Sequence, residues 1–221
     1  MKTAILVDGG FYRRRAQSAF GDQTAQQRAI ELSKYCRRHL KMHGEHSDLY
    51  RIFYYDCAPS NKRIFHPFKQ QQVDLGKTEL YAWTTQFLNE LKKKRKFAIR
   101  LGKLAEEQAH YIIRPDIVKK LCNGHLKFND LTEDDFCLEI DQKGVDMKIG
   151  LDIASMAYKH QVDQIVLISG DSDFVSAAKL ARREGIDFIL DPLGAPIKPD
   201  LFEHIDGLRT CDKAYTAHTK K

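Results

Sequence analysis

Short apolar runs alternate along the chain with longer stretches in which apolar residues recur every three or four positions. Each of the short apolar runs, which contain few charges, predicts a strand that is buried on both faces of a sheet. The longer stretches predict helices that turn one apolar side inward. The expected strands cover residues 3–7, 49–55, 97–101, 165–169 and 186–190, with an edge strand at 208–210. One helix is expected directly after Gly10. The other expected helices cover residues 25–42, 77–96, 143–160, 172–184 and 199–204. This alternation predicts an α/β fold around a mainly parallel sheet.

Three parts of the chain lack this regular alternation. Residues 59–75 contain two prolines and are predicted to form a loop. Residues 102–140 combine a short helix, an acidic run and one alternating segment, and we interpret them as an insertion that forms a small β-lobe or a lid. We expect this insertion to lie within a single domain of residues 1–211, followed by a flexible polar tail at 212–221.

The composition is that of a globular protein with a basic surface. Of the 221 residues, 43% are hydrophobic and 30% are charged, and the formal net charge is +6. A positive balance favours polyanionic partners such as nucleic acids. The chain has no apolar run long enough for a transmembrane helix and does not start with a signal peptide. We therefore expect a cytoplasmic protein without membrane contact.

The cysteines are scattered along the chain and form no Cys-x-x-Cys pair, which argues against a disulfide framework and against a thiolate zinc site. One local group remains, consisting of Cys36, His39, His43 and His46. The first three would share one face of a helix and could bind a metal ion. Lysines and arginines surround them, so an exposed basic helix is the competing interpretation.

Aspartates stand where predicted strands end or where the next helix begins. Asp8 follows the first strand and Asp146 opens a helix. Asp171 and Asp173 follow the strand at 165–169. Because the strands of a parallel sheet end at one edge, we expect these side chains to converge. Like charges at short range repel one another unless a cation joins them, and oxygen ligands without a nearby cysteine favour Mg²⁺ or Mn²⁺ over Zn²⁺.

Each acid also has a simpler interpretation. Asp8 and Asp171 could cap the helices that follow them. Asp152 is a further ligand candidate that could equally be a surface residue, and Asp56 could belong to a turn. A shared metal site explains the whole set better than separate caps do. Ser169, at the end of its strand, could hydrogen-bond a carboxylate or a water molecule on the metal.

Basic residues near the same edge are candidates to hold the backbone of a phosphodiester substrate: Arg13, Arg14, Lys143 and Lys148. A divalent cation held by the aspartates could activate a water molecule for attack on such a substrate. Other kinds of site do not match. The chain has no Gly-x-Gly-x-x-Gly after the first strand, no Walker-type Gly-Lys-Ser/Thr and no Gly-x-Ser-x-Gly elbow.

The segments that carry these residues resemble the NYN domain family, and most closely its LabA-like bacterial branch. They are Ile5–Tyr12, Tyr54–Pro59, Lys143–Asp152, Leu167–Phe174 and Asp200–Asp206, in this order along the chain. The resemblance is weakest over the insertion. Many PIN-like domains carry an asparagine shortly after the first aspartate, where this chain has Gly10 and Phe11.

The NYN family belongs with the PIN-like nucleases, so the resemblance implies a three-layer PIN-like sandwich and a metal-dependent ribonuclease. It implies that the family's acids map to Asp8, Asp146, Asp171 and Asp173 and bind Mg²⁺ or Mn²⁺. RNA or another single-stranded nucleic acid would be the partner, and a homodimer is one option for the assembly. Two alternatives stay open: a catalytically silent nucleic-acid-binding or regulatory adaptor, and a metal-dependent phosphatase that acts on small phosphorylated molecules.

Overall fold

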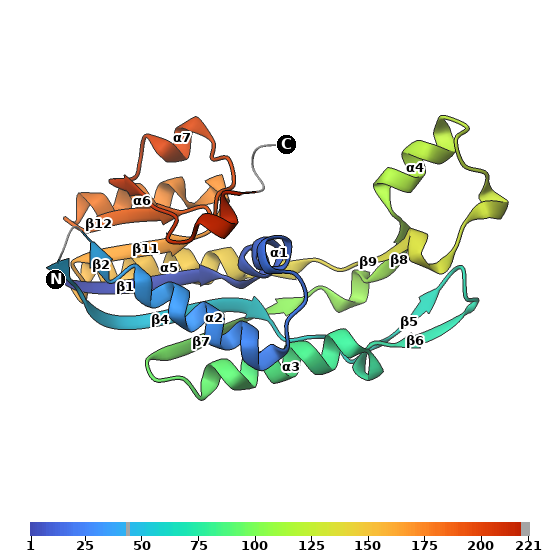
Figure 1. The fold of residues 1–221 in the computed structure, drawn as a ribbon, viewed down its shortest axis with the longest axis horizontal. Coiled ribbons are helices and arrows are strands. Elements are labelled where there is room, and N and C mark those ends of the chain that lie inside the picture. Colours follow the sequence, from blue (N-terminus) through green and yellow to red (C-terminus); the bar gives the residue numbers. More distant parts are fainter. Residues whose placement is uncertain (43–44, 218–221) are drawn as a thin grey trace.

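A mainly parallel sheet forms the centre of the computed structural model, which describes residues 1–42 and 45–217 (Figure 1). Within these residues the main sheet has seven strands in the order β10-β7-β4-β1-β11-β12-β13. Every neighbouring pair is parallel except β10 with β7. The strand bounds are Lys2–Asp8 (β1), Asp48–Cys57 (β4), Phe97–Leu104 (β7), Gln142–Lys143 (β10), Gln164–Ile168 (β11), Asp187–Asp191 (β12) and Gly207–Leu208 (β13). The predicted strands and their parallel arrangement are confirmed.

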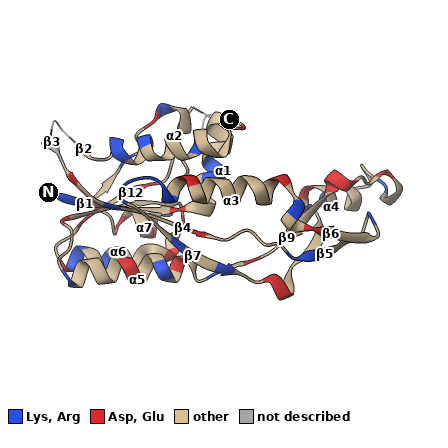
Figure 2. Ribbon diagram, turned by 90° about the horizontal axis from the view of Figure 1, so that it is seen from below, with Lys and Arg blue, Asp and Glu red and all other residues tan. Residues whose placement is uncertain are grey.

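Helices cover both faces of the sheet and complete a three-layer α/β sandwich (Figure 2). Side chains alternate between the two hydrophobic cores along a strand. In β1, Ile5 and Val7 point to one core, and Ala4 and Leu6 point to the other. Burial on both faces explains why residues 4–7 of this strand are all apolar. The first core lies under α1 (Gly9–Phe20), α2 (Ala25–Arg38) and α3 (Glu79–Lys92), and the second under α5 (Val145–Tyr158) and α6 (Val175–Arg183).

Two helices are shorter than the apolar pattern predicts, since α2 ends at Arg38 and α3 at Lys92. Two-residue strands, Lys41–Met42 (β2) and Glu45–His46 (β3), pair after α2 instead of continuing it. The short helix near the C-terminal end is Pro199–Phe202 (α7). None of the helices in the described parts of the chain is both long and apolar enough to cross a membrane.

The order in which the chain adds strands to the sheet reverses between β1 and β11. From β1 the chain adds β4 and β7 on one side, and later adds β11, β12 and β13 on the other. In doubly wound α/β sheets, ligands bind in the crevice at the carboxyl ends of the strands where this reversal occurs. Val7 pairs with Ile168 in register, so the following residues, Asp8 and Ser169, meet at this point. The fold therefore brings two predicted site residues to a binding edge.

A distal lobe extends beyond one end of the sheet (Figure 1). His66 and Tyr111 join its two segments, with ring centroids 4.2 Å apart, and Lys69 forms an ion pair with Glu133. The prediction of a loop at 59–75 is wrong, because these residues pair as a hairpin whose side chains pack on the insertion. The lobe consists of β5 (Arg63–His66), β6 (Gln71–Asp74), β8 (His110–Ile113), α4 (Pro115–Cys122) and β9 (Phe136–Glu139).

A buried carboxylate at the end of β12 joins α2 to the C-terminal segment. Asp191 is 0% exposed and accepts hydrogen bonds from Tyr35 Oη, from His39 Nε2 at 2.9 Å and from Thr210 Oγ1 at 2.9 Å. The Tyr35 hydroxyl in turn accepts from Cys211 N at 3.2 Å. A carboxylate this deeply buried needs such partners, because an unpaired one would lose its hydration without compensation.

This network supports neither interpretation of the Cys36 group for the residues that the structure describes. Cys36 and His39 are buried in the core, so they do not lie on an exposed basic helix. His39 directs one ring nitrogen to Asp191, which makes it part of the fold. His43 and the side chain of His46 lie outside the described residues.

The beginning of the predicted flexible tail is also part of the core. Lys213–Tyr215 forms a 3₁₀ helix, η6, and Tyr215 is 1% exposed. Its ring packs edge-on against Tyr35, with ring centroids 5.2 Å apart. The prediction of a tail is therefore wrong for residues 212–217, and residues 218–221 lie outside the described part of the chain.

Replacing Tyr35 with phenylalanine removes one donor from the buried Asp191. We expect the free energy of unfolding to fall by about 1–3 kcal/mol, because the carboxylate loses a hydrogen bond that nothing replaces. Urea unfolding followed by circular dichroism measures the change. Tyr158→Phe is the matched control, since Tyr158 is 61% exposed and surface substitutions stay within about 0.5 kcal/mol. Equal effects of the two substitutions would contradict the role given to Asp191.

Candidate functional site

Asp8 is both the last residue of β1 and the N-cap of α1. Its Oδ1 accepts a hydrogen bond from Phe11 N at 3.0 Å. Gly9 allows the helix to start here, because a Cβ at this position would lie 2.5 Å from Tyr54 Cζ. The second carboxylate oxygen, Oδ2, accepts from Ser169 Oγ at 3.2 Å. The cap proposed from the sequence therefore exists, and it leaves one oxygen of Asp8 turned toward the end of β11.

The turn after β11 brings Asp171 to the same place. Asp171 N donates to Ser169 Oγ at 3.3 Å, and Asp171 Oδ1 accepts from Asp173 N at 3.0 Å as the cap of a 3₁₀ turn, Ser172–Phe174 (η5). Gly170 packs so closely on Phe11 that a Cβ would lie 2.6 Å from its ring. The Ser169 hydroxyl thus links Asp8 with the Asp171 turn, and a glycine permits the close contact.

Asp146 and Asp173 complete the group through their charges. Burial raises the pKa of Asp8, and the negative charge of Asp146 raises it further. Partial burial also raises the pKa of Asp146, together with the charges of Asp171 and Asp173. The charge of Asp146 therefore opposes the ionisation of Asp8, and the charges of Asp171 and Asp173 oppose that of Asp146. The aspartates that were predicted to converge lie close enough for the charge of Asp146 to link the other three, and we call them the carboxylate cluster: Asp8, Asp146, Asp171 and Asp173.

The carboxylate cluster has the donor chemistry for a hard divalent cation, because its ligand atoms are oxygens. The charge of Arg14 lowers the pKa of Asp8, but burial outweighs it. The charges that act on the Asp146 carboxyl are those of two further aspartates. Among residues 1–42 and 45–217, no three His, Cys, Asp or Glu side chains are already arranged to hold a metal ion. Binding would therefore require these side chains to move closer together.

Asp152 lies apart from the carboxylate cluster. Its Oδ2 accepts hydrogen bonds from Tyr55 Oη at 2.8 Å and from Arg100 Nε at 3.0 Å. It is thus paired with β4 and β7, and the structure does not support it as a metal ligand. Its position within a helix left a metal ligand and a surface residue equally open, because the sequence does not show which strand the side chain meets.

Arg13 has a structural partner that its position in the sequence did not suggest. Its Nη2 lies 3.1 Å from Asp56 Oδ1. Asp56 is 1% exposed and also accepts from Tyr54 Oη at 3.0 Å. Arg13 therefore neutralises a buried acid at the end of β4, and Asp56 is not a free turn residue.

A cavity of about 380 Å³ opens beside Asp8 and Asp171, and Arg14 and Lys198 line it. Lys198 Nζ donates to Ser172 Oγ at 3.0 Å. The sequence analysis missed Lys198, although the loop after β12 ends at the same edge of the sheet and could have indicated it. The other two predicted basic residues, Lys143 on β10 and Lys148 on α5, are exposed and do not line this cavity.

Residues 2–196 match the family model described as the NYN domain. The chain therefore belongs to the NYN domain family. The matched range contains the whole carboxylate cluster, and it confirms the resemblance drawn from the sequence. Because the match is to the family as a whole, the LabA-like branch stays a prediction. NYN domains are generally nucleases of the PIN-like class.

The crystal structure of a protein of unknown function from Vibrio parahaemolyticus is similar to this chain. The TM-score is 0.50 with 19% sequence identity, over 96% of this chain and 94% of that chain. This similarity extends to the fold alone, a mostly parallel sheet flanked by helices. No curated protein sequence matches the chain.

Replacing Ser169 with alanine tests the link at the centre of the NYN domain's carboxylate cluster. Ser169 is 0% exposed, so we expect the free energy of unfolding to fall by about 1–2 kcal/mol. The serine hydroxyl favours the ionised form of Asp8, and its loss raises the pKa of that carboxyl further. The loss of stability is therefore larger at pH 7 than at pH 4, where more of Asp8 is protonated.

Urea unfolding at the two pH values measures this difference. Ser176→Ala is the matched control, because Ser176 is exposed on α6. A Ser169→Ala effect as small as that of the control, or one that grows as the pH falls, would contradict the hydrogen bond to an ionised Asp8.

Proposed function

We propose that this NYN domain is a metal-dependent ribonuclease that hydrolyses phosphodiester bonds. The observation that carries the proposal is the convergence of Asp8, Asp146 and Asp171 at the reversal point of the sheet, where like charges face one another. Family membership supports a nuclease, and the net charge of +6 supports a polyanionic substrate.

In this proposal Asp8, Asp146 and Asp171 hold Mg²⁺ or Mn²⁺, and Asp173 supports them from the adjacent turn. The cation supplies charge neutralisation and activation of water when it is bound. Ser169 keeps one oxygen of Asp8 fixed through the hydrogen bond of 3.2 Å. Two helix starts fix the backbone at Asp8 and Asp171, and their side chains would move closer together when the cation binds.

The substrate backbone would enter the cavity beside Asp8, where Arg14 and Lys198 offer positive charge to a phosphate. Lys143 and Lys148 are exposed near the start of α5, and we propose them as contacts for more distant phosphates. Arg13 would act indirectly, because its ion pair with Asp56 fixes the side of α1 that faces the substrate.

A nucleic-acid-binding adaptor is the second candidate function. It is favoured by the spacing of the acids, because no three of them within the described residues are already arranged as metal ligands. An adaptor would bind RNA through the same basic side chains without cleaving it.

Single-stranded RNA incubated with Mn²⁺ distinguishes the two functions. We expect cleavage that EDTA abolishes, and a loss of at least about 100-fold in Asp8→Asn, because an amide gives the metal a weaker, uncharged ligand. Asp152→Asn is the control from the same set of candidate acids and should cleave normally. RNA binding without cleavage would support the adaptor. Equal cleavage by wild type and Asp8→Asn would refute the mechanism.

A further inference from the structure

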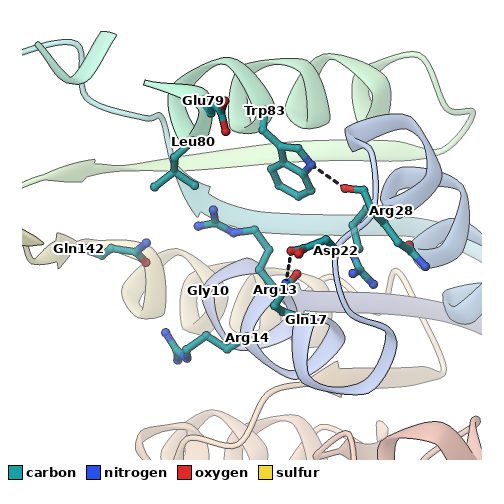
Figure 3. Close-up of a pocket in the computed structure, with 11 residues that line it drawn as sticks. Gly10, Arg13, Arg14, Gln17, Asp22, Arg28, Glu79, Leu80, Trp83 and Gln142 are labelled. Atoms are coloured by element: carbon teal, nitrogen blue, oxygen red, sulfur yellow. Dashed lines mark hydrogen bonds between the residues drawn. The ribbon is translucent and has the colours of Figure 1, made fainter. Parts of the chain in front are cut away.

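A second, larger cavity lies beside the carboxylate cluster. It has a volume of about 610 Å³, within the usual range for small-ligand sites. It lies between α1, the turn that leads into α2, and α3 (Figure 3). We call it the Trp83 pocket, after the side chain that α3 contributes. Arg14 lines both cavities, so they lie next to each other along α1.

Buried polar atoms without a hydrogen-bond partner are concentrated around this pocket. The described residues contain four such side-chain atoms, and three belong to pocket residues: Arg13 Nε, Gln23 Oε1 and Arg28 Nη1. Arg28 is only 2% exposed, and the nearest carboxylate oxygen, Glu31 Oε2, lies 3.7 Å away. An unpaired buried polar group is costly. The walls of the pocket therefore hold polar groups whose hydrogen-bonding capacity is not used within the protein.

Trp83 gives the pocket a flat apolar wall. Phe87 stacks on one face of the indole, with ring centroids 5.1 Å apart and planes 14° from parallel. Trp83 Nε1 donates to Gln23 O at 2.9 Å, which fixes the orientation of the ring (Figure 3). Leu80, 69% exposed, extends the apolar wall. A preset aromatic ring with one covered face suits the stacking of a single planar base.

The charges of the pocket fit a nucleotide better than a plain hydrocarbon. Arg13, Arg14 and Arg28 supply cations, whereas Asp22 and Glu79 supply acceptors. Arg13 is already paired with Asp56, so Arg14 is the cation best placed for a phosphate at the junction of the two cavities. Asp22 and Glu79, which are exposed at the pocket, would meet the N–H groups of a base.

Gly10 lies between the two sites. A Cβ built on Gly10 would lie 3.6 Å from Asp8 Oδ1 and 3.6 Å from Gln142 Oε1, which are ordinary contact distances. The half-buried backbone of Gly10 therefore adjoins both the carboxylate cluster and the Gln142 side of the Trp83 pocket. A strand whose phosphate lies at Asp8 would pass across Gly10.

We propose that the Trp83 pocket binds one unstacked nucleotide of a single-stranded nucleic acid, with its base on Trp83 and its phosphate toward Arg14. That the ligand is a nucleic-acid strand rests on the proposed function. That one of its bases stacks on Trp83 rests on the pocket itself. A base inside a duplex cannot reach the indole, so the pocket selects single strands.

Fluorescence tests this binding without any cleavage, because Trp83 is the only tryptophan in the chain. The protein is titrated in EDTA with a 2′-O-methyl oligonucleotide, with AMP, CMP, GMP and UMP, and with inorganic phosphate. We expect saturable quenching by the oligonucleotide, weaker quenching by mononucleotides and none by phosphate. Absence of quenching by the oligonucleotide would overturn the proposal. If mononucleotides bind as tightly as the oligonucleotide, the pocket binds a free nucleotide, and the proposal is also overturned.

Matched arginine variants locate the phosphate contact in the same assay. Arg14→Gln should weaken oligonucleotide binding about tenfold, because it removes a charge-assisted contact. Arg37→Gln should leave binding unchanged, since Arg37 is exposed on α2 and lines no part of the pocket. Equal effects of the two variants would show that only net charge matters and would overturn the proposed placement.

Cleavage kinetics test the base contact separately. Trp83→Ala should raise KM for single-stranded RNA about tenfold with little change in kcat, and Trp83→Phe should restore most of the loss. Gln86→Ala, exposed on the same helix, is the control. Circular dichroism shows whether each variant is folded. If Trp83→Ala does not fold, Arg14→Gln still tests the proposal.

The two assays separate this proposal from the nuclease. Saturable quenching without RNA cleavage would support the pocket and refute the ribonuclease. Cleavage with the same KM in wild type and Trp83→Ala would support the ribonuclease and refute the pocket.

Discussion

The carboxylate cluster of this NYN domain depends on the in-register pairing of β1 with β11. That pairing places Asp8 beside Ser169, and the serine hydroxyl then contacts both Asp8 and the turn that carries Asp171. A shift of one residue would turn every side chain of β11 to the opposite face of the sheet. The two hydrophobic cores prevent such a shift, because β1 and β11 contribute alternate residues to each of them. The energy that stabilises the sheet therefore also positions the acids.

The same edge carries an electrostatic cost that the rest of the fold has to offset. The pKa of Asp8 and that of Asp146 are both raised, so the folded state holds carboxylates that oppose one another at neutral pH. This penalty is present above the raised pKa values and fades as the pH falls below them. Elsewhere the protein pairs its buried acids, as Arg13 does for Asp56 and Tyr35 for Asp191. At the reversal point of the sheet, acids instead raise the pKa of their neighbours, and a cation bound there would relieve this repulsion.

Position along the chain was informative where the backbone alone determines direction. Asp8 and Asp171 could be predicted because each follows an apolar run, and parallel strands end at one edge. Asp152 could not, because its partners Tyr55 and Arg100 come from strands far away in the sequence. The Asp191 network and the packing of Tyr215 likewise depend on contacts between distant segments. The β5–β6 hairpin could not be predicted because prolines interrupt its pattern. The position of Lys198 could not be predicted because it lies in a long loop without a periodic pattern.

The central claim is that the carboxylate cluster of this chain binds one divalent cation. Electron paramagnetic resonance of Mn²⁺ titrated into the metal-free protein measures this directly, without any substrate. The account predicts one bound Mn²⁺ per chain in wild type, an affinity at least about tenfold lower in Asp171→Asn, and no change in Asp48→Asn, which alters an exposed acid at the start of β4. Wild-type protein that binds no Mn²⁺, or binds it equally well after Asp171→Asn, would contradict the account.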